Sequence, residues 1–327
     1  MRRRLGAHGP AAGAIGLGCM GMSEFYAPVD EAEAVATIHR ALELGLTLID
    51  TSDMYGRGEN ERLVGRALRG RRERAVLATK GGFLRRAEDP RYRGVDGTPA
   101  HLRAACDASL QRLGVDEIDL YYLHRVDPHV AIEESVGALV ELVRAGKVRH
   151  IGLSEVTPGT LRRAGAVAPI AVVQSEYSLF TRDVEQNGVL SAARELGIGL
   201  VAYAPLGRGM LTGALRSTAR LAPDDLRRRV PRFDPEHFDR NLELVDALAA
   251  IARDVRCTPA QLALAWLLAR GDDVVALPGC ERVAHVEENA AAASVVLDAP
   301  VLARVDAALP PGAASGARFR AQRVAER

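Results

Sequence analysis

The sequence predicts one α/β domain spanning residues 1–327, a single (β/α)8 barrel with extra helices and an insertion after the seventh strand. Eight short runs rich in Val, Ile and Leu recur along the 327 residues, and helical segments separate them. Most of these runs are continuously apolar rather than alternating, which is typical of strands buried on both faces of a parallel sheet. Eight parallel strands joined by crossover helices close most simply into a barrel, and the chain length suits one.

The eight predicted strands are distributed over the whole chain. They begin at Ile15, Leu46, Ala75, Glu117, Lys147, Ile170, Ile198 and Val274. Three of the intervening segments, 30–45, 98–114 and 258–271, start with a residue that can cap a helix and end with Gly. In the second and third, Pro follows the cap directly, which is a position that the first turn of a helix tolerates. These segments are therefore expected to be helices.

An open, doubly wound sheet is the alternative fold. It is disfavoured because no G-x-G-x-x-G pattern opens a helix after an early strand, and no linker divides the chain. The seventh unit is irregular: 205–235 has the composition of a loop, and 236–255 has that of a helix. An insertion of this size in one strand-to-helix connection is usually functional.

Composition excludes several classes of protein. The 43 basic and 42 acidic residues leave a formal charge of +1, so no overall field favours nucleic acid or an anionic membrane. Arg2, Arg3 and Arg4 resemble the start of a secretory leader, but glycines interrupt the next segment and no run approaches the roughly 20 apolar residues of a membrane span. The four cysteines and eight histidines lack metal-ligand spacing. A cytoplasmic protein without a metal is expected.

Chemistry in such a barrel occurs at the carboxyl ends of the strands. The second predicted strand ends at Asp50, with Tyr55 in the following loop, and the next two end at Lys80 and His124. Each residue alone has an ordinary explanation, as a helix cap, a packed aromatic, a solvated strand end or a core histidine. Four of them at the same depth of the same face indicate a site.

These positions resemble the catalytic residues of the aldo-keto reductase superfamily. The resemblance rests on IDTSDMYG, LATKGG and YYLHRVD, and it extends from GLGCMGMS at Gly16 through IGLSE at Ile151 and YAPLGRG at Tyr203 to PGCER at Pro278. Several ordered motifs are much more specific than one short pattern. The resemblance implies that Asp50, Tyr55, Lys80 and His124 are catalytic.

The resemblance also implies reduction of aldehydes or ketones to alcohols with NADPH, or less readily NADH. Tyr55 would give the proton, Lys80 would lower the pKa of that phenol, and Asp50 would hold the lysine in place. His124 would orient a small-molecule carbonyl substrate. The alternative is a nucleotide-binding sensor or subunit with this fold and no physiological turnover. A hydrolase or isomerase would need a carboxylate pair, and Asp50 with Asp53 is the only pair nearby.

The cofactor would lie across the later strand ends. The residues that the resemblance assigns to it are Ser154, Gln174, Tyr203, Pro205, Leu206, Gly207, Arg208, Gly209, Gly279, Arg282, Glu288 and Asn289. Cys280 and Glu281 depart from the hydroxyl and basic residue that the family commonly places at the 2′-phosphate, so Arg282 would have to compensate. The tail 310–327 is rich in small and basic residues and is expected to be flexible or to lie over the barrel. Substrate and oligomeric state cannot be predicted.

Overall fold

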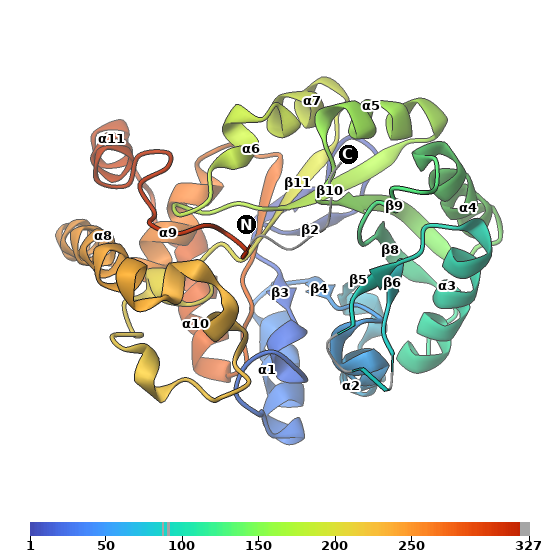
Figure 1. Cartoon of the computed structure of the whole chain (residues 1–327), viewed down its shortest axis with the longest axis horizontal. Coiled ribbons are helices and arrows are strands. Elements are labelled where there is room, and N and C mark those ends of the chain that lie inside the picture. The colour runs from blue at the N-terminus through green and yellow to red at the C-terminus, as the bar shows by residue number, and fades with distance from the viewer. Residues whose placement is uncertain (87, 90–91, 321–327) are drawn as a thin grey trace.

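The computed structural model describes residues 1–86, 88–89 and 92–320 and shows a ring of eight parallel strands (Figure 1). In the order in which they pair around the ring, they are β3 (Leu17–Gly18), β4 (Leu48–Asp50), β5 (Val76–Gly81), β8 (Ile118–Leu123), β9 (Val148–Ser154), β10 (Ile170–Glu176), β11 (Gly199–Tyr203) and β12 (Val274–Leu277). Each predicted apolar run contains one of them.

The first and last strands close the ring. Ile15 pairs in parallel with Ala276, and Gly18 pairs with Gly279. The Gly16 N–H donates to the Ala276 carbonyl at 2.8 Å, so the closing seam has ordinary backbone hydrogen bonds. The sheet is therefore a barrel, which confirms the predicted fold and excludes the open sheet.

Helices cover the outside of the ring (Figure 1). They are α1 (Glu31–Glu43), α2 (Glu59–Leu68), α3 (Pro99–Leu113), α4 (Ile132–Arg144), α5 (Pro158–Val167), α6 (Asp183–Gln186), α7 (Val189–Glu195), α8 (Pro235–Asp254), α9 (Pro259–Leu268), α10 (Val283–Ala291) and α11 (Ala299–Ala308). The predicted caps are present: the Thr98 side chain accepts from the His101 N–H, and Thr258 forms a reciprocal capping box with Gln261. No helix in the described ranges combines the length and apolar character needed to cross a membrane.

An N-terminal hairpin fills the amino end of the barrel. The three arginines that resemble a leader form β1 (Arg2–Arg4), which pairs antiparallel with β2 (Ala11–Gly13). Leu5 and Ala12 are fully buried and pack with apolar side chains from inside the ring. Since this end is plugged, the polar chemistry is left to the carboxyl ends of the strands.

Short turns and loops surround the carboxyl end. A second hairpin, β6 (Phe83–Leu84) with β7 (Gly94–Val95), follows β5. The turns of 3-10 helix are η1 (Met20–Met22), η2 (Tyr55–Gly58), η3 (Arg72–Arg74), η4 (Met210–Thr212), η5 (Thr218–Arg220), η6 (Leu226–Arg229), η7 (Pro231–Phe233) and η8 (Ala292–Ser294). Four of them, η4 to η7, lie in the predicted insertion, and α8 follows it.

The C-terminal segment returns to the barrel. After α11 it leads back toward the middle of the ring, where it is drawn in dark red (Figure 1). Its Arg318 contacts Glu155, just beyond β9, and Tyr203, at the end of β11. Arg318 thus lies at the strand ends, whereas Ser315 contacts His237 and Asn241 on α8. Residues 321–327 lie outside the described residues.

Candidate active site

The four side chains predicted to be catalytic converge at the carboxyl end of the barrel. Lys80 on β5 donates from Nζ to the carboxylate of Asp50, at the end of β4, and to the Tyr55 hydroxyl at 3.3 Å. The same ammonium donates to the Thr51 carbonyl at 2.8 Å. The ring of His124, which follows β8, stands nearly perpendicular to that of Tyr55 with 6.0 Å between centroids.

A tight turn fixes the position of Tyr55. The backbone is left-handed at Gly56 (φ 55°), Arg57 (φ 55°) and Gly58 (φ 91°) before α2 begins. Two glycines meet this requirement without strain, whereas Arg57 adopts a conformation that few side chains favour. The turn holds the phenol beside Lys80 while the chain reverses away from the strand ends.

The lysine and aspartate form a buried ion pair. Lys80 is 0% exposed and Asp50 is 3% exposed. Burial would lower the pKa of Lys80, but the nearby Asp50 and Tyr55 oxygens outweigh it and raise this pKa above its ordinary value. The lysine therefore stays charged next to the phenol.

The pKa of Tyr55 differs from the prediction in its net direction. Lys80 lowers it, as expected, but burial acts more strongly and raises the pKa above the ordinary value of a phenol. Hence the Tyr55 hydroxyl stays protonated when no ligand is bound. It is poised to donate only when negative charge appears on a neighbouring oxygen.

His124 is held neutral and oriented. Its Nδ1 lies 3.0 Å from the Ser52 hydroxyl oxygen, and the Phe83 ring packs edge-on at 4.6 Å between centroids. Burial, followed by the positive charges of Lys80 and Arg125, lowers its pKa well below the ordinary value. Because Nδ1 is engaged, Nε2 is the ring nitrogen left for a ligand.

Ser154, Gln174 and Tyr203, at or near the ends of β9, β10 and β11, form the adjacent part of the same rim. Gln174 Nε2 donates to Asp50 Oδ2 at 2.9 Å, which joins this part to the four central residues. Ser154 Oγ accepts from Arg125 Nη1 at 3.1 Å. A buried hydroxyl, a buried amide and an aromatic ring can together hold a flat ring that carries a carboxamide.

The loop after β11 contains one cation and is tightly turned: the Gly207 and Gly209 N–H groups donate to the Ala204 and Leu206 carbonyls. Its five predicted residues are Pro205, Leu206, Gly207, Arg208 and Gly209, of which the first two are buried and the others half-buried. The backbone is left-handed at Gly207 (φ 58°), Arg208 (φ 57°) and Gly209 (φ 90°). Successive turns of this kind can expose N–H groups to an anion. The Arg208 guanidinium lies 3.7 Å from Glu176, so it is already paired in part.

The remaining predicted cofactor residues follow β12. Gly279 is exposed, and Arg282 is exposed at the start of α10, whose first turn has no side-chain cap. Glu288 is half-buried, while Asn289 is buried and donates from Nδ2 to Cys280 Sγ at 3.1 Å. An uncapped helix start with an adjacent arginine suits a phosphate.

Glu281 is turned away from this helix start. A Cβ added to Gly21 would lie 2.3 Å from Glu281 Oε1, so the carboxylate rests against the loop after β3. Burial raises the pKa of Glu281, and Arg227 and Arg282 oppose that effect. The negative charge of Glu281, a departure from the basic residue that the resemblance leads us to expect, is thus partly offset by Arg227 and Arg282.

Sequence reasoning missed a cluster of arginines around Glu176. Arg318 Nη2 donates to the Glu155 carboxylate and, at 3.4 Å, to the Tyr203 hydroxyl, while its Nε lies 3.4 Å from Glu176. Arg232 Nη1 lies 3.7 Å from the same Glu176. The basic composition of the tail was visible in the sequence, but no spacing linked it to strands so distant along the chain.

The residues at the carboxyl end fit a nicotinamide nucleotide. Glu176 Oε2 is buried without a hydrogen-bond partner among the described residues, although arginines surround it. Three arginines (Arg208, Arg232 and Arg318) face two carboxylates (Glu155 and Glu176), and the remaining positive charge can attract the phosphates of such a molecule. The polar groups at the ends of β9 and β10 can accommodate its carboxamide.

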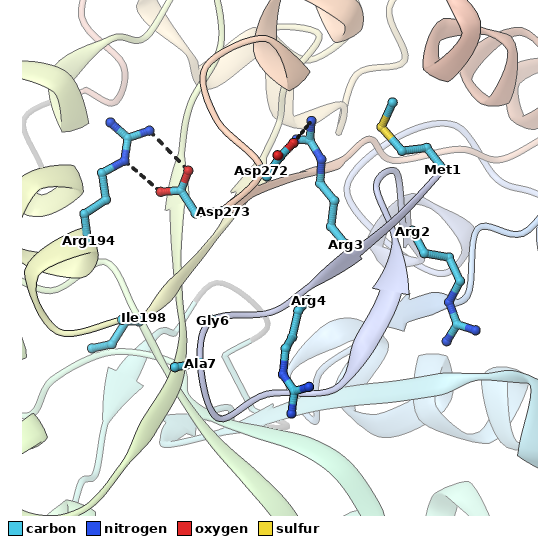
Figure 2. A pocket seen from close by; sticks show the side chains of 11 residues that line it. Met1, Arg2, Arg3, Arg4, Gly6, Ala7, Arg194, Ile198, Asp272 and Asp273 are labelled. Atoms are coloured by element: carbon cyan, nitrogen blue, oxygen red, sulfur yellow. Dashed lines mark hydrogen bonds and ion pairs between the residues drawn. The ribbon is translucent and has the colours of Figure 1, made fainter.

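A hollow of about 700 Å³ lies at the opposite end of the barrel. Figure 2 shows it between the N-terminal hairpin and the loops that precede β11 and β12, with the Arg194 guanidinium directed at the Asp273 carboxylate. Arg194 Nε lies 2.8 Å from Asp273, and Arg3 lies 3.4 Å from Asp272. These arginines are neutralised within the protein, and none of the predicted site residues lines this hollow.

The sequence matches a model of the Aldo/keto reductase family over residues 14–310. It is 45% identical to the Aldo-keto reductase yakc [NADP(+)] of Schizosaccharomyces pombe over 310 residues, which cover 94% of this chain and 91% of that protein. It is 42% identical to the Probable aldo-keto reductase 1 of Glycine max, with 97% and 91% covered.

Solved structures resemble the whole chain as well. The glycerol dehydrogenase AKR11B4 from Gluconobacter oxydans superposes with a TM-score of 0.86 at 32% identity, with 94% of each chain covered. An aldo/keto reductase from Klebsiella pneumoniae in complex with NADP and acetate superposes with a TM-score of 0.72 at 29% identity, with 97% of this chain and 98% of that chain covered.

Proposed function

Since the chain belongs to the aldo/keto reductase family, we propose that it reduces the carbonyl group of aldehydes or ketones to an alcohol with NADPH. The observation that carries the proposal is the contact of one buried ammonium with two partners: Lys80 donates both to Asp50 and to the Tyr55 hydroxyl. This arrangement places a proton donor and a fixed positive charge together, which is what a carbonyl oxygen gaining negative charge requires.

NADPH, when bound, would supply the hydride that the carbonyl carbon accepts. Tyr55 donates its proton to the carbonyl oxygen as negative charge develops there. Lys80 stabilises the phenolate that remains, because its charge lowers the pKa of the phenol against the effect of burial. Asp50 keeps the ammonium charged and aimed at the phenol.

His124 binds and orients the substrate oxygen. Because the ring is neutral, it can donate one hydrogen bond from Nε2 without bringing a second positive charge beside Lys80. The aromatic rings of Phe83 and Phe25 stand next to His124 and Tyr55, with centroids 4.6 Å and 6.3 Å apart. They give the carbonyl an apolar wall, and they exclude water from one side of it.

The later strand ends hold the cofactor. Ser154 and Gln174 would bind the carboxamide, and the ring of Tyr203 would stack on the nicotinamide. Residues 205–209 would hold the pyrophosphate, with Arg208 as the cation and the N–H groups that are not used within the loop as further donors. Gly279 and Arg282 would bind the 2′-phosphate at the start of α10, and Glu288 and Asn289 would contact the adenine. The Schizosaccharomyces pombe relative, whose name includes NADP(+), supports this choice of cofactor.

A two-part experiment tests the proposal. A difference titration with NADPH and with NADH measures binding, and the loss of NADPH absorbance with a panel of aldehydes and ketones measures turnover. We expect NADPH to bind more tightly than NADH and aromatic aldehydes to be reduced. Binding without turnover of any carbonyl compound would instead support a nucleotide-binding sensor or subunit, and a lack of binding would refute both functions.

We also propose that residues 1–327 form one cytoplasmic domain. The four cysteines are free, and Cys19, Cys106 and Cys280 are buried. Unpaired thiols are typical of a reducing compartment. Fractionation of the cells that make the protein, followed by detection of the chain in the soluble cytoplasmic fraction, tests the location.

A further inference from the structure

Ser52 contacts His124 on the side away from the substrate. It follows Asp50 by two residues, is fully buried, and places Oγ 3.0 Å from His124 Nδ1. The same oxygen lies 3.1 Å from Asp53 Oδ1. The roles described above use Ser52 only as the partner that engages His124 Nδ1, and they do not use Asp53. These two residues nevertheless form a continuous hydrogen-bonded path to the imidazole.

The hydroxyl of Ser52 has one proton and more than one acceptor. It accepts from the Met54 N–H at 3.2 Å, so it can donate to the His124 Nδ1, to Asp53 Oδ1 or, at 3.4 Å, to the Lys80 carbonyl. A neutral imidazole carries its hydrogen on one nitrogen only. The tautomer of His124 therefore depends on the direction of its hydrogen bond with Ser52. If Ser52 donates to Nδ1, the hydrogen of the imidazole is on Nε2; if Ser52 donates to another acceptor, Nδ1 can carry the hydrogen.

The contact of Ser52 with the Lys80 carbonyl, at 3.4 Å, is the longest of the three, and two arrangements use the shorter contacts. If Ser52 donates to Nδ1, the hydrogen of His124 is on Nε2, where it can be donated to a carbonyl oxygen. If Ser52 donates to Asp53, His124 donates from Nδ1 to Ser52, and Nε2 presents a lone pair. That second form can accept a hydrogen bond from an alcohol but cannot stabilise the oxygen of a carbonyl.

The charge of Asp53 decides between them. A carboxylate is a stronger acceptor than a neutral imidazole nitrogen and attracts the Ser52 proton, whereas a protonated carboxyl group can donate to Ser52 instead. We propose that Ser52 and Asp53 are positioning residues that select the tautomer of His124, an inference that rests on the proposed function. Protonated Asp53 sets the form that reduces carbonyls, and ionised Asp53 sets the form that accepts from alcohols.

The change between the two arrangements balances in protons. The carboxyl proton of Asp53 moves to Ser52, the hydroxyl proton of Ser52 moves to Nδ1, and the proton of Nε2 leaves toward the active site. One proton is lost in total, and Asp53 ends ionised. The imidazole remains neutral throughout, in agreement with a pKa that burial and Lys80 keep well below its ordinary value.

The surroundings of Asp53 place its titration in the neutral range. Burial, followed by the negative charge of Glu61 on α2, raises the pKa of Asp53 to about 7. The Ser52 hydroxyl, Arg112 on α3 and the Met54 N–H oppose this rise. The Tyr121 phenol on β8 also faces Asp53. The His124 imidazole is connected to Asp53 only through Ser52.

Nitrogen NMR of the full-length protein, labelled with ¹⁵N-histidine and free of substrate, tests the proposal. His124→Gln identifies the His124 signals by their absence. We expect the hydrogen to be mainly on Nε2 below about pH 7 and mainly on Nδ1 above it, since that is where Asp53 titrates. The readout does not require turnover, so it is separate from any failure of the proposed function.

Two variants and one control complete the test. Asp53→Asn and Ser52→Ala should each abolish the pH-dependent change of tautomer, and Asp53→Asn should also remove the matching inflection from the pH profile of kcat/KM for reduction. Asp224→Asn, at an exposed aspartate, should keep both. A wild-type tautomer that does not change between pH 5.5 and 8.5 overturns the proposal, as does a normal change in Asp53→Asn.

Discussion

The guanidinium of Arg318 donates to the hydroxyl of Tyr203, with 3.4 Å between Nη2 and the phenolic oxygen. The same side chain is the counter-ion of Glu155 and, in part, of Glu176. Without it, Glu155 would lose the guanidinium that hydrogen-bonds to it, and Glu176 would keep only Arg208 and Arg232, each at 3.7 Å. More negative charge would then face the phosphates of the cofactor. We therefore expect Arg318→Ala to weaken NADPH binding roughly tenfold or more.

Fluorescence titration with NADPH measures this effect. Arg320→Ala is the matched control, because Arg320 belongs to the same segment but pairs with Asp234 at an exposed position. It should leave the dissociation constant within a factor of about two. Unchanged or tighter binding by Arg318→Ala would show that the C-terminal segment opposes the cofactor rather than supporting it.

Tyr55→Phe removes the proton donor and little else. The ring that packs at 6.3 Å from Phe25 and 6.0 Å from His124 is retained, so the site should keep its shape. General acid catalysis contributes about 10²- to 10⁴-fold, and kcat for carbonyl reduction should fall by that factor. Stopped-flow or steady-state absorbance of NADPH measures kcat, and an NADPH titration of the variant should give the wild-type constant. Retention of normal turnover would show that another group donates the proton.

The barrel could be predicted because each of its parts has a local pattern. Eight apolar runs, and caps such as Thr98 and Thr258, act over a few residues and need no knowledge of distant contacts. The N-terminal hairpin had no such pattern. Arg2–Arg4 forms a strand because Arg3 donates to carbonyls at 268, 271 and 274, at the far end of the chain.

The candidate site was predictable to the same extent. The residues that end buried strands, such as Lys80 and Ser154, were found from position alone, since the fold fixes where strand ends point. The contacts of Arg318 were not found, because they depend on the path of a segment that is far from those strands in sequence. The contact of Ser52 with His124 was missed for a related reason: it is set by the turn that follows β4, and turn geometry has a weak sequence pattern.

Removing the ammonium of Lys80 should destabilise the protein. Lys80→Met keeps the length of the side chain but leaves the buried Asp50 carboxylate without its counter-ion. Breaking a buried pair on one side costs about 3–5 kcal/mol. The double variant Lys80→Met with Asp50→Asn should lose less, because neither group is then charged. Urea unfolding followed by circular dichroism measures the free energies, and equal losses in the single and double variants would contradict the pairing.

The neutral His124 makes stability depend on pH. Its pKa is lowered in the folded protein, whereas an unfolded chain has an ordinary value of about 6.5. Below that pH the unfolded state binds one more proton, so stability is complete above about pH 6.5 and falls as the pH is lowered. The slope from this group is at most about 1.4 kcal/mol per pH unit. Measuring the free energy of unfolding of wild type and of His124→Gln between pH 5 and 7 isolates the contribution of this group. Parallel curves of free energy against pH would show that folding does not keep the imidazole neutral.

Discrimination between the two nicotinamide cofactors should depend on the start of α10. Arg282 is exposed there beside an uncapped first turn, and Glu281 is folded against the loop at Gly21. Only NADPH carries a 2′-phosphate, so Arg282→Ala should weaken NADPH binding by roughly tenfold and leave NADH binding unchanged. Glu281→Gln removes a carboxylate whose charge Arg282 partly offsets, so more of the Arg282 charge is left for the 2′-phosphate and the preference should shift further toward NADPH. The measurement is the ratio of the dissociation constants for NADPH and NADH on each variant. A general loss of folding affects both constants and cancels in this ratio. An unaltered ratio in Arg282→Ala would show that the 2′-phosphate binds elsewhere.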